Sequence, residues 1–303
     1  MKKNDLRMSE TKGKLYRAFC WVFVLFFAFC FTFPLYWIIT GSFKNGQEIN
    51  SATPVWFPSE WVMNNYEKLM NERAVPLFEL NLGSITITGP TIPAAIKWLI
   101  NTVLMAVVSM IITCITSAMA GYVLAKKRFY GKTLLFSLIV CAMALPKQVV
   151  LIPLVRLMSD MDLYDNIWAV ILPIVGWPFG VFLLKQFSEG IPGEMIEAAR
   201  IDGAGEVRTF VDVVIPMIKP GIGALAIFTF ISSWNDYFMQ LIMLTSSKNL
   251  TISLGIATMQ GETSTDYGLL MAGAALASVP IIIVFLIFQK YFTKGITMGA
   301  VKG

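Results

Sequence analysis

Residues 98–125 read WLINTVLMAVVSMIITCITSAMAGYVLA, a stretch of 28 uncharged residues enclosed by Lys97 and Lys126. About 20 apolar residues are enough for an α-helix to cross the hydrocarbon core of a bilayer. Three further uncharged stretches reach this length: 26 residues between Arg17 and Lys44, 19 between Asp165 and Lys185, and 23 between Asp266 and Lys290. The sequence therefore predicts helices that cross a membrane.

Two more expected spans each contain one charged residue. Thr133–Val155 carries Lys147 and Gly221–Leu244 carries Asp236, which brings the prediction to six transmembrane helices. The composition agrees, because 56% of the residues are hydrophobic and only 14% are charged, against about 25% charged residues in a soluble domain. The predicted fold class is an all-α integral membrane protein.

The positive charges in the connections predict the orientation, because Lys and Arg are enriched in cytoplasmic loops. Residues 1–17 carry six Lys/Arg and residues 126–132 carry four, whereas residues 41–96 carry three against five Glu. Lys290 at the end of the last apolar stretch, with Lys294 and Lys302 after it, adds three lysines and no acid. Both termini are therefore expected to be cytoplasmic.

This orientation defines the expected organisation of the chain. The segments are a cytoplasmic N-terminal tail (1–17), a first transmembrane helix (18–40), an extracytoplasmic loop (41–95), a five-helix core (96–290) with a cytoplasmic loop at 188–220, and a cytoplasmic C-terminal tail (291–303). Residues 67–95 match no pattern that assigns them a role.

Several kinds of chemistry are excluded. The chain has no histidine, and its four cysteines lie inside apolar stretches, so the usual zinc sites and His-based catalytic triads are not expected. Gly131-Lys132-Thr133 looks like the end of a P-loop, but Lys126 stands where the first glycine is required. The basic residues gather at the ends of apolar spans rather than on a nucleic-acid-binding face. We expect no catalytic residue, metal site or cofactor in this chain.

The longest cytoplasmic connection, 191–220, reads IPGEMIEAARIDGAGEVRTFVDVVIPMIKP. Pro192 can open a short helix and Glu194 suits its positive end, while Asp202-Gly203 signals a helix stop. A second helical stretch is expected from Gly205 into the fifth span. The short helix has small residues at Ala198, Ala199, Gly203 and Ala204. It predicts either a docking element for a partner protein or an amphipathic connector that rests on lipid.

Polar residues at membrane depth are costly and by default indicate function. The expected translocation-path residues are Lys147, Gln148, Trp234, Asn235, Asp236, Tyr237 and Gln240. Pro146 and Pro153 are expected to interrupt their helix and let polar groups line a cavity. The alternatives are that Asp236 pairs with a neighbouring helix to fix packing and that Lys147 reaches the membrane interface.

The segment EAARIDGAGEVRTFVDVVIPMIKP resembles the EAA loop of bacterial ABC importer permeases. The resemblance rests on Glu197, Ala198, Ala199, Asp202, Gly203 and Ala204, followed by Phe210, Pro216 and Pro220. It implies a type I ABC importer permease fold, in which this loop forms the coupling helix that seats in a separate ATPase subunit.

LPKQVVLIPLV (145–155), SWNDYF (233–238) and KGITMGAVKG (294–303) are similar to the carbohydrate-uptake branch of that family, and to the shorter permease of maltose-type transporters. This likeness implies a sugar or sugar-like solute, a second permease in a heterodimer, two ATPase chains that bind ATP and Mg, an extracytoplasmic solute-binding protein, and a place in the bacterial plasma membrane. It also implies an ATPase-contact tail, formed by Gly299, Ala300, Val301, Lys302 and Gly303. The alternative function is a secondary transporter of a small polar solute.

Overall fold

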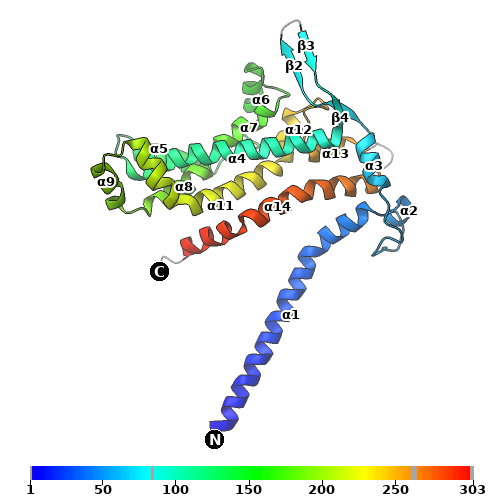
Figure 1. Ribbon diagram of the computed structural model, residues 1–303, viewed down its shortest axis with the longest axis horizontal. Coiled ribbons are helices and arrows are strands. Elements are labelled where there is room, and N and C mark those ends of the chain that lie inside the picture. The colour runs from blue at the N-terminus through cyan, green and yellow to red at the C-terminus, as the bar shows by residue number, and fades with distance from the viewer. Residues whose placement is uncertain (1, 83–84, 261–264, 301–303) are drawn as a thin grey trace. The chain divides into compact units, whose positions relative to one another are not determined.

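The computed structural model describes residues 2–82, 85–260 and 265–300. They fold mainly into helices, with two short two-stranded sheets (Figure 1), which confirms the predicted helical class. The chain divides into two compact units, Met1–Asn71 with Gln260–Leu276 and Glu72–Met259 with Ala277–Gly303. The last helix, α14 (Tyr267–Ala300), begins in the first unit and continues in the second.

The first unit contains α1 (Lys2–Ser42), α2 (Gly46–Ile49), α3 (Asn64–Asn71) and the first turns of α14. Asn65 is a buried polar residue of this unit. Its side-chain amide donates to the carbonyls of Ser42 (2.9 Å) and Lys44 (2.8 Å). These bonds satisfy acceptors at the end of α1 that no helical N–H can reach. An ion pair between Lys68 and Asp266 (2.9 Å) joins α3 to the residue before α14.

The second unit is built around α4 (Ala94–Lys126). Against it pack α7 (Ile167–Val175), α8 (Pro178–Glu189), α11 (Ile215–Trp234) and α13 (Ile252–Thr258), and Figure 1 shows α4, α8 and α11 side by side. A Cβ atom at Gly121 would lie 2.7 Å from the backbone nitrogen of Lys185, and one at Gly221 would lie 2.6 Å from the ring of Phe187. Small residues of this kind let membrane helices approach closely.

A β-ribbon precedes α4. β1 (Ala74–Pro76) pairs antiparallel with β4 (Thr91–Pro93), and β2 (Glu79–Leu82) pairs antiparallel with β3 (Ile85–Thr88). The bonds Leu77 N–H to Pro90 C=O and Gly89 N–H to Phe78 C=O, both 2.9 Å, connect the two sheets. The pair β2 and β3 projects from the unit in Figure 1. The sequence predicted only a loop here, because strands of three or four residues are too short to show a clear alternation.

Five helical segments within the described residues are long and apolar enough to cross a membrane. They are Tyr16–Ser42, Ala94–Lys126, Ile167–Glu189, Glu206–Trp234 and Tyr267–Gln289. Each overlaps one of the six expected spans. The helix α1 begins at Lys2 and so extends beyond the expected span towards the N-terminus.

The structure divides the remaining expected span, 133–155, into α5 (Lys132–Ala142) and α6 (Leu151–Asp160). Turns around Pro146 separate them, because proline lacks the N–H and clashes with the preceding turn. Pro153 does not interrupt a helix, contrary to expectation. It is the third residue of α6, where an N–H has no partner within the helix.

The helical stretch expected from Gly205 into the span 221–244 begins where it was predicted, but it is divided. It starts with α10 (Glu206–Thr209) and continues through a wider π-helical turn, η1 (Phe210–Val214), into α11. The wide turn precedes Pro216, whose ring an ordinary α-helical turn would press against the carbonyl of Asp212. The chain leaves the helix at Asn235 and resumes as α12 (Tyr237–Met243).

Asp165 joins two loops of the second unit. Its carboxylate accepts the N–H groups of Thr245 (2.8 Å) and Ser246 (3.0 Å), while its own N–H donates to the carbonyl of Met243 (3.0 Å). Burial alone would raise the pKa of this carboxyl, but the hydrogen bonds from Ser246 and Thr245 outweigh it and lower the pKa. The ionised carboxylate therefore stabilises the fold.

We predict that Asp165→Asn lowers the free energy of unfolding by about 2 kcal/mol, because charge-assisted hydrogen bonds are lost. The matched control is Asp162→Asn, since both residues have positive φ (55° and 56°). The stabilisation is present above the unfolded carboxyl pKa of about 4 and is lost as the pH falls through the lower folded pKa. Thermal unfolding should show a Tm deficit at pH 7 that shrinks towards pH 3. An equal deficit in Asp162→Asn would contradict this account.

Candidate functional site

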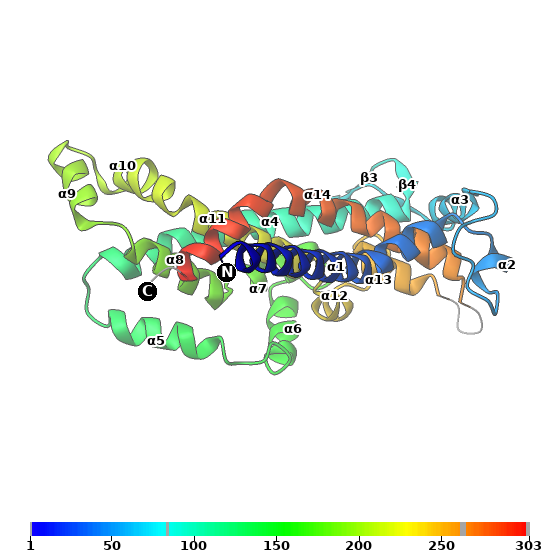
Figure 2. The ribbon, with the colours of Figure 1, turned by 90° about the horizontal axis from the view of Figure 1, so that it is seen from below.

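The connection between α8 and α11 contains a short helix, α9 (Gly193–Ile201), as its sequence predicted. Pro192 is the N-cap, and its carbonyl accepts the N–H of Met195 (3.3 Å). Glu194 lies in the first turn and Arg200 in the last, so each charge opposes the partial charge of its helix end. Figure 2 shows α9 and α10 together at one end of this unit.

The predicted stop at Asp202-Gly203 is confirmed. Gly203 has φ +80°, a conformation that favours glycine. Its N–H donates to the carbonyl of Arg200 (3.0 Å), and the N–H of Ala204 donates to the carbonyl of Ala199 (2.9 Å). These two bonds form a Schellman motif, which satisfies the last carbonyls of α9 and fixes the direction in which the chain leaves.

One buried side chain anchors α9 to the helices behind it. Ile196 is 6% exposed, although its neighbours on the helix are mostly exposed. It belongs to a hydrophobic cluster with Ala118, Tyr122, Leu184, Ile191, Val214, Ile218 and Leu225. These residues come from α4, α8, η1 and α11 or lie next to them, so α9 cannot shift without disturbing that packing.

Polar contacts fasten the same loop to the end of α4. Lys126 donates to the carbonyl of Ile191 (2.6 Å). Glu206 pairs with Lys127 and with Arg200 (3.0 Å). From the sequence, Lys126 and Lys127 could be used only to predict the membrane orientation. Glu206 lies about 80 residues after Lys127, so no local pattern indicates that the two residues pair.

The outer face of α9 and of the turn after it is accessible. Glu197, Ala198, Asp202 and Gly203 are exposed, and Ala199 and Ala204 are half-buried. Two apolar side chains are unusually open: Ile201 is 86% exposed and Val207 is 77% exposed. Acidic and apolar groups thus share this face. The one basic residue of α9, Arg200, is exposed and pairs with Glu206, whereas a helix that rests on lipid would present several Lys and Arg beside its apolar residues.

A second candidate site is a cavity of about 500 Å³ in the same unit. Its walls come from the segment between α5 and α6, the α7–α8 junction and the break after α11. The lining residues are Ala142, Met143, Leu145, Lys147, Val150, Leu154, Pro173, Ile174, Gly176, Trp177, Pro178, Phe179, Ser232, Asp236 and Met239. The sequence missed Trp177 and Phe179, which lie on either side of Pro178 at the α7–α8 junction.

The cavity holds an ion pair. Lys147 Nζ lies 3.4 Å from Asp236 Oδ2, with the lysine side chain 56% exposed and the aspartate 14% exposed. The other oxygen of Asp236 accepts the N–H of Met239 (3.3 Å) and so caps α12. Asp236 therefore both pairs with a residue of the segment between α5 and α6 and lines the cavity.

The structure does not place the other expected path residues in this lining. Trp234 is buried and stacks on Phe230, with 5.5 Å between the ring centroids. Gln240 is buried, donates to the carbonyl of Ser233 (3.1 Å) and accepts from Thr251 (2.5 Å). Gln148, Asn235 and Tyr237 are exposed elsewhere. Periodicity alone could not separate packing residues from cavity residues.

The expected ATPase-contact tail is only partly described. Gly299 and Ala300 are the last residues of α14. Val301, Lys302 and Gly303 lie outside the described residues.

Comparison with known proteins gives consistent matches. A family model described as "Binding-protein-dependent transport system inner membrane component" matches residues 117–298. The arabinooligosaccharides transport system permease protein AraQ of Halalkalibacterium halodurans is 31% identical over 92% of this chain and 94% of its own length. The diacetylchitobiose uptake system permease protein NgcG of Streptomyces coelicolor is 27% identical over 98% of this chain and 92% of its own.

Among solved structures, a chain of a bacterial ABC transporter involved in the import of the acidic polysaccharide alginate has a similar fold. The TM-score is 0.77 at 21% identity, covering 93% of this chain and 98% of that chain.

We predict that Gly203→Ala weakens the end of α9 by about 1 kcal/mol, because a left-handed backbone disfavours any Cβ. Gly205→Ala is the matched control, since Gly205 has φ −70° and a Cβ at either glycine meets nothing within 4 Å. Amide hydrogen exchange of residues 199–204 should become about fivefold faster in Gly203→Ala only. Equal exchange rates in the two variants would show that the Schellman turn does not determine how often this segment opens.

Proposed function

The chain belongs to the family of binding-protein-dependent transport system inner membrane components, and from this membership we propose that it forms, with a second permease, the import path for a sugar or sugar-like solute. The observation that carries the proposal is α9: a short, capped helix with an exposed face and one buried anchor. It lies inside the segment that the family model matches.

The proposed assembly contains this chain, a second homologous permease, two ATPase chains that bind ATP and Mg, and an extracytoplasmic solute-binding protein. In it, α9 is the coupling helix, with Glu197, Asp202 and Gly203 at the contact. An acidic and apolar surface with two open aliphatic side chains suits a protein groove, where Ile201 and Val207 become buried. Gly299–Gly303 are proposed to reach the ATPases as well.

Two helices connect α9 with the cavity. α11 runs from the η1 turn, which contributes Val214 to the cluster around Ile196, to Trp234, two residues before Asp236. At 1.5 Å per residue this 20-residue helix spans about 30 Å. α8 runs from the cavity residues Pro178 and Phe179 to Glu189, next to the loop. A displacement of α9 by ATP-driven motion of the ATPases would therefore act on both walls of the cavity.

The cavity suits a sugar-like solute. Its volume of about 500 Å³ is in the range of small-molecule sites. Trp177 and Phe179 offer aromatic surface for the apolar faces of a sugar ring, and the charged pair offers hydrogen-bonding groups for hydroxyls. The names of the two relatives refer to oligosaccharides of arabinose and to diacetylchitobiose, which supports the same substrate class.

The proposed orientation places both termini in the cytoplasm and the chain in a bacterial plasma membrane. α5 and α6 together then supply the third of six crossings. ATP hydrolysis belongs to the partner chains, so uptake should stop when the ATPase subunit is inactivated and should persist when ion gradients are collapsed.

We predict that Glu197→Lys prevents the ATPase from co-purifying with the permease, because it reverses a charge at the proposed contact. Glu197 is exposed, so the membrane fold should remain intact by thermal unfolding. Glu67→Lys is the control, as it makes the same reversal at an exposed residue of α3. Normal co-purification of Glu197→Lys would count against the coupling assignment.

We also predict that Asp236→Asn lowers the uptake rate roughly tenfold without loss of assembly. Asparagine can still cap α12. The substitution therefore removes the charge that faces Lys147 but keeps the N-terminal cap of the helix intact. Lys147→Gln should have a similar effect, and the double variant should be no worse than either single variant, because both act on one ion pair. Normal uptake by both single variants would show that the pair does not serve transport.

A further inference from the structure

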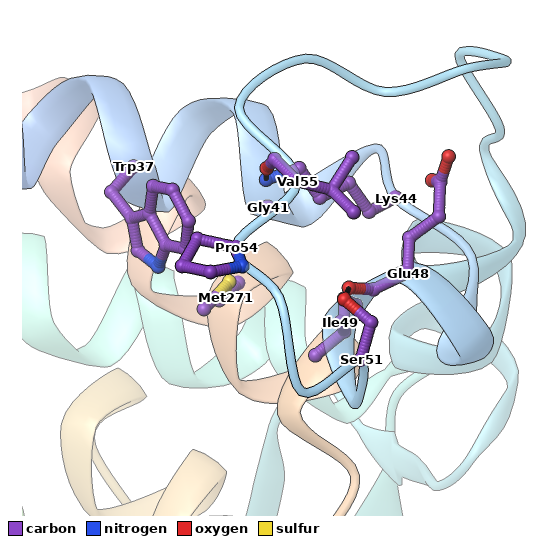
Figure 3. Close-up of a pocket in the computed structure, with 9 residues that line it drawn as sticks. All are labelled: Trp37, Gly41, Lys44, Glu48, Ile49, Ser51, Pro54, Val55 and Met271. Atoms are coloured by element: carbon purple, nitrogen blue, oxygen red, sulfur yellow. Dashed lines mark hydrogen bonds between the residues drawn. The ribbon is translucent and has the colours of Figure 1, made fainter.

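The first unit contains a separate, smaller pocket of about 150 Å³ at the end of α1 (Figure 3). The residues that line it are Trp37, Gly41, Lys44, Glu48, Ile49, Ser51, Pro54, Val55 and Met271. They come from the last turns of α1, from the connection to α2, from α2 and the loop after it, and from the first turns of α14. Six of the nine lining residues are apolar, and Lys44 is the one basic residue among the nine.

Lys44 is a buried cation. The residue is 2% exposed. Its ammonium donates to the carbonyl of Val55 (2.5 Å) and lies 4.2 Å from the centre of the Trp37 ring. In the described part of the chain, no carboxylate oxygen lies within 4.0 Å of it. An ammonium group has three donors, so the carbonyl leaves hydrogen-bonding capacity for a further acceptor.

The acidic residue that lines the pocket, Glu48, forms its hydrogen bonds with groups other than Lys44. Glu48 accepts the N–H and the hydroxyl of Ser59 and the N–H of Asn45 (3.4 Å). These hydrogen bonds lower the pKa of Glu48, so it remains ionised while it caps α2. Burial lowers the pKa of Lys44, and the charge of Glu48 offsets this only in part. The buried ammonium thus lacks a direct counter-charge, which makes an anion its most favourable ligand.

The position of the pocket indicates where such an anion would come from. The apolar segment Tyr16–Ser42 ends two residues before Lys44, and the apolar segment that contains Met271 begins at Tyr267. Aromatic rings surround the same end of α1: Trp56 contacts Phe33 and Trp37, with ring centroids 6.0 Å and 6.1 Å apart. Aromatic belts of this kind mark the level of lipid headgroups.

We propose that this pocket binds a phosphate group, with Lys44 as the recognising cation and a phospholipid headgroup as the source. A volume of about 150 Å³ equals about five water molecules at roughly 30 Å³ each, which is room for a phosphate and the first atoms of its ester. Phosphate supplies the charge and the acceptors that the buried ammonium lacks. The acyl chains would lie along the apolar surface of α1, where Phe29 and Phe31 are exposed.

The test uses the purified transporter in detergent after its lipids have been removed. Three probes are added separately: dioleoylphosphatidylglycerol, dioleoylglycerol, which has the same chains without phosphate, and inorganic phosphate. Binding is followed by native mass spectrometry and by the shift in Tm. The variants are Lys44→Met, which keeps the length of the side chain, and Lys44→Arg, which keeps its charge. The control is Lys68→Gln, which removes an exposed lysine of the same unit.

Wild type, Lys44→Arg and Lys68→Gln should retain dioleoylphosphatidylglycerol, while Lys44→Met should bind it at least tenfold more weakly. Dioleoylglycerol should bind weakly to all four. Lys44-dependent binding of inorganic phosphate without binding of the lipid would support the phosphate site and assign it to the free ion. Equal retention of the phospholipid by Lys44→Met and wild type would overturn the proposal. If Lys44→Met does not assemble, equal binding of both dioleoyl lipids to wild type would overturn it instead.

Discussion

The second unit depends on one close contact between two helices. At Gly121, α4 approaches the backbone of α8 so closely that a Cβ atom would lie 2.7 Å from the nitrogen of Lys185. Lipid provides no hydrophobic driving force that would bring helices together, so close contact between backbones is a main source of packing energy. The contact brings Tyr122 and Leu184 into the cluster that encloses Ile196. The position of α9 is thus a consequence of the α4–α8 crossing.

The same packing explains how α9 is connected to the distant cavity. α8 and α11 each have one end at the cluster under α9 and the other end at the cavity with Lys147 and Asp236. Close-packed helices transmit displacement because they compress little. The cavity itself lies where three helices are interrupted: between α5 and α6, between α7 and α8, and after α11. Irregular backbone at membrane depth is tolerated where it lines a cavity or is covered by protein.

Much of the fold could be predicted from the sequence because the relevant interactions are local. Apolar length indicated membrane helices, Pro146 indicated a break, and Asp202-Gly203 indicated the end of α9. The same reasoning erred at Pro153, which a helix tolerates in its first turn, and at the β-ribbon, whose strands are too short for a pattern. Trp234 and Gln240, which were expected on the translocation path, are buried outside the cavity lining.

By itself, then, the sequence determined which long apolar segments are helical, where α9 begins and ends, and which motif it carries, since each depends on residues within a turn or two of one another. Only the tertiary structure decided which polar groups meet. Lys147 and Asp236 are 89 residues apart, and Asn65 reaches carbonyls more than 20 residues earlier. Helical periodicity indicates which residues share a face. Whether that face meets protein, lipid or a cavity is decided by packing between distant helices, which no local pattern encodes.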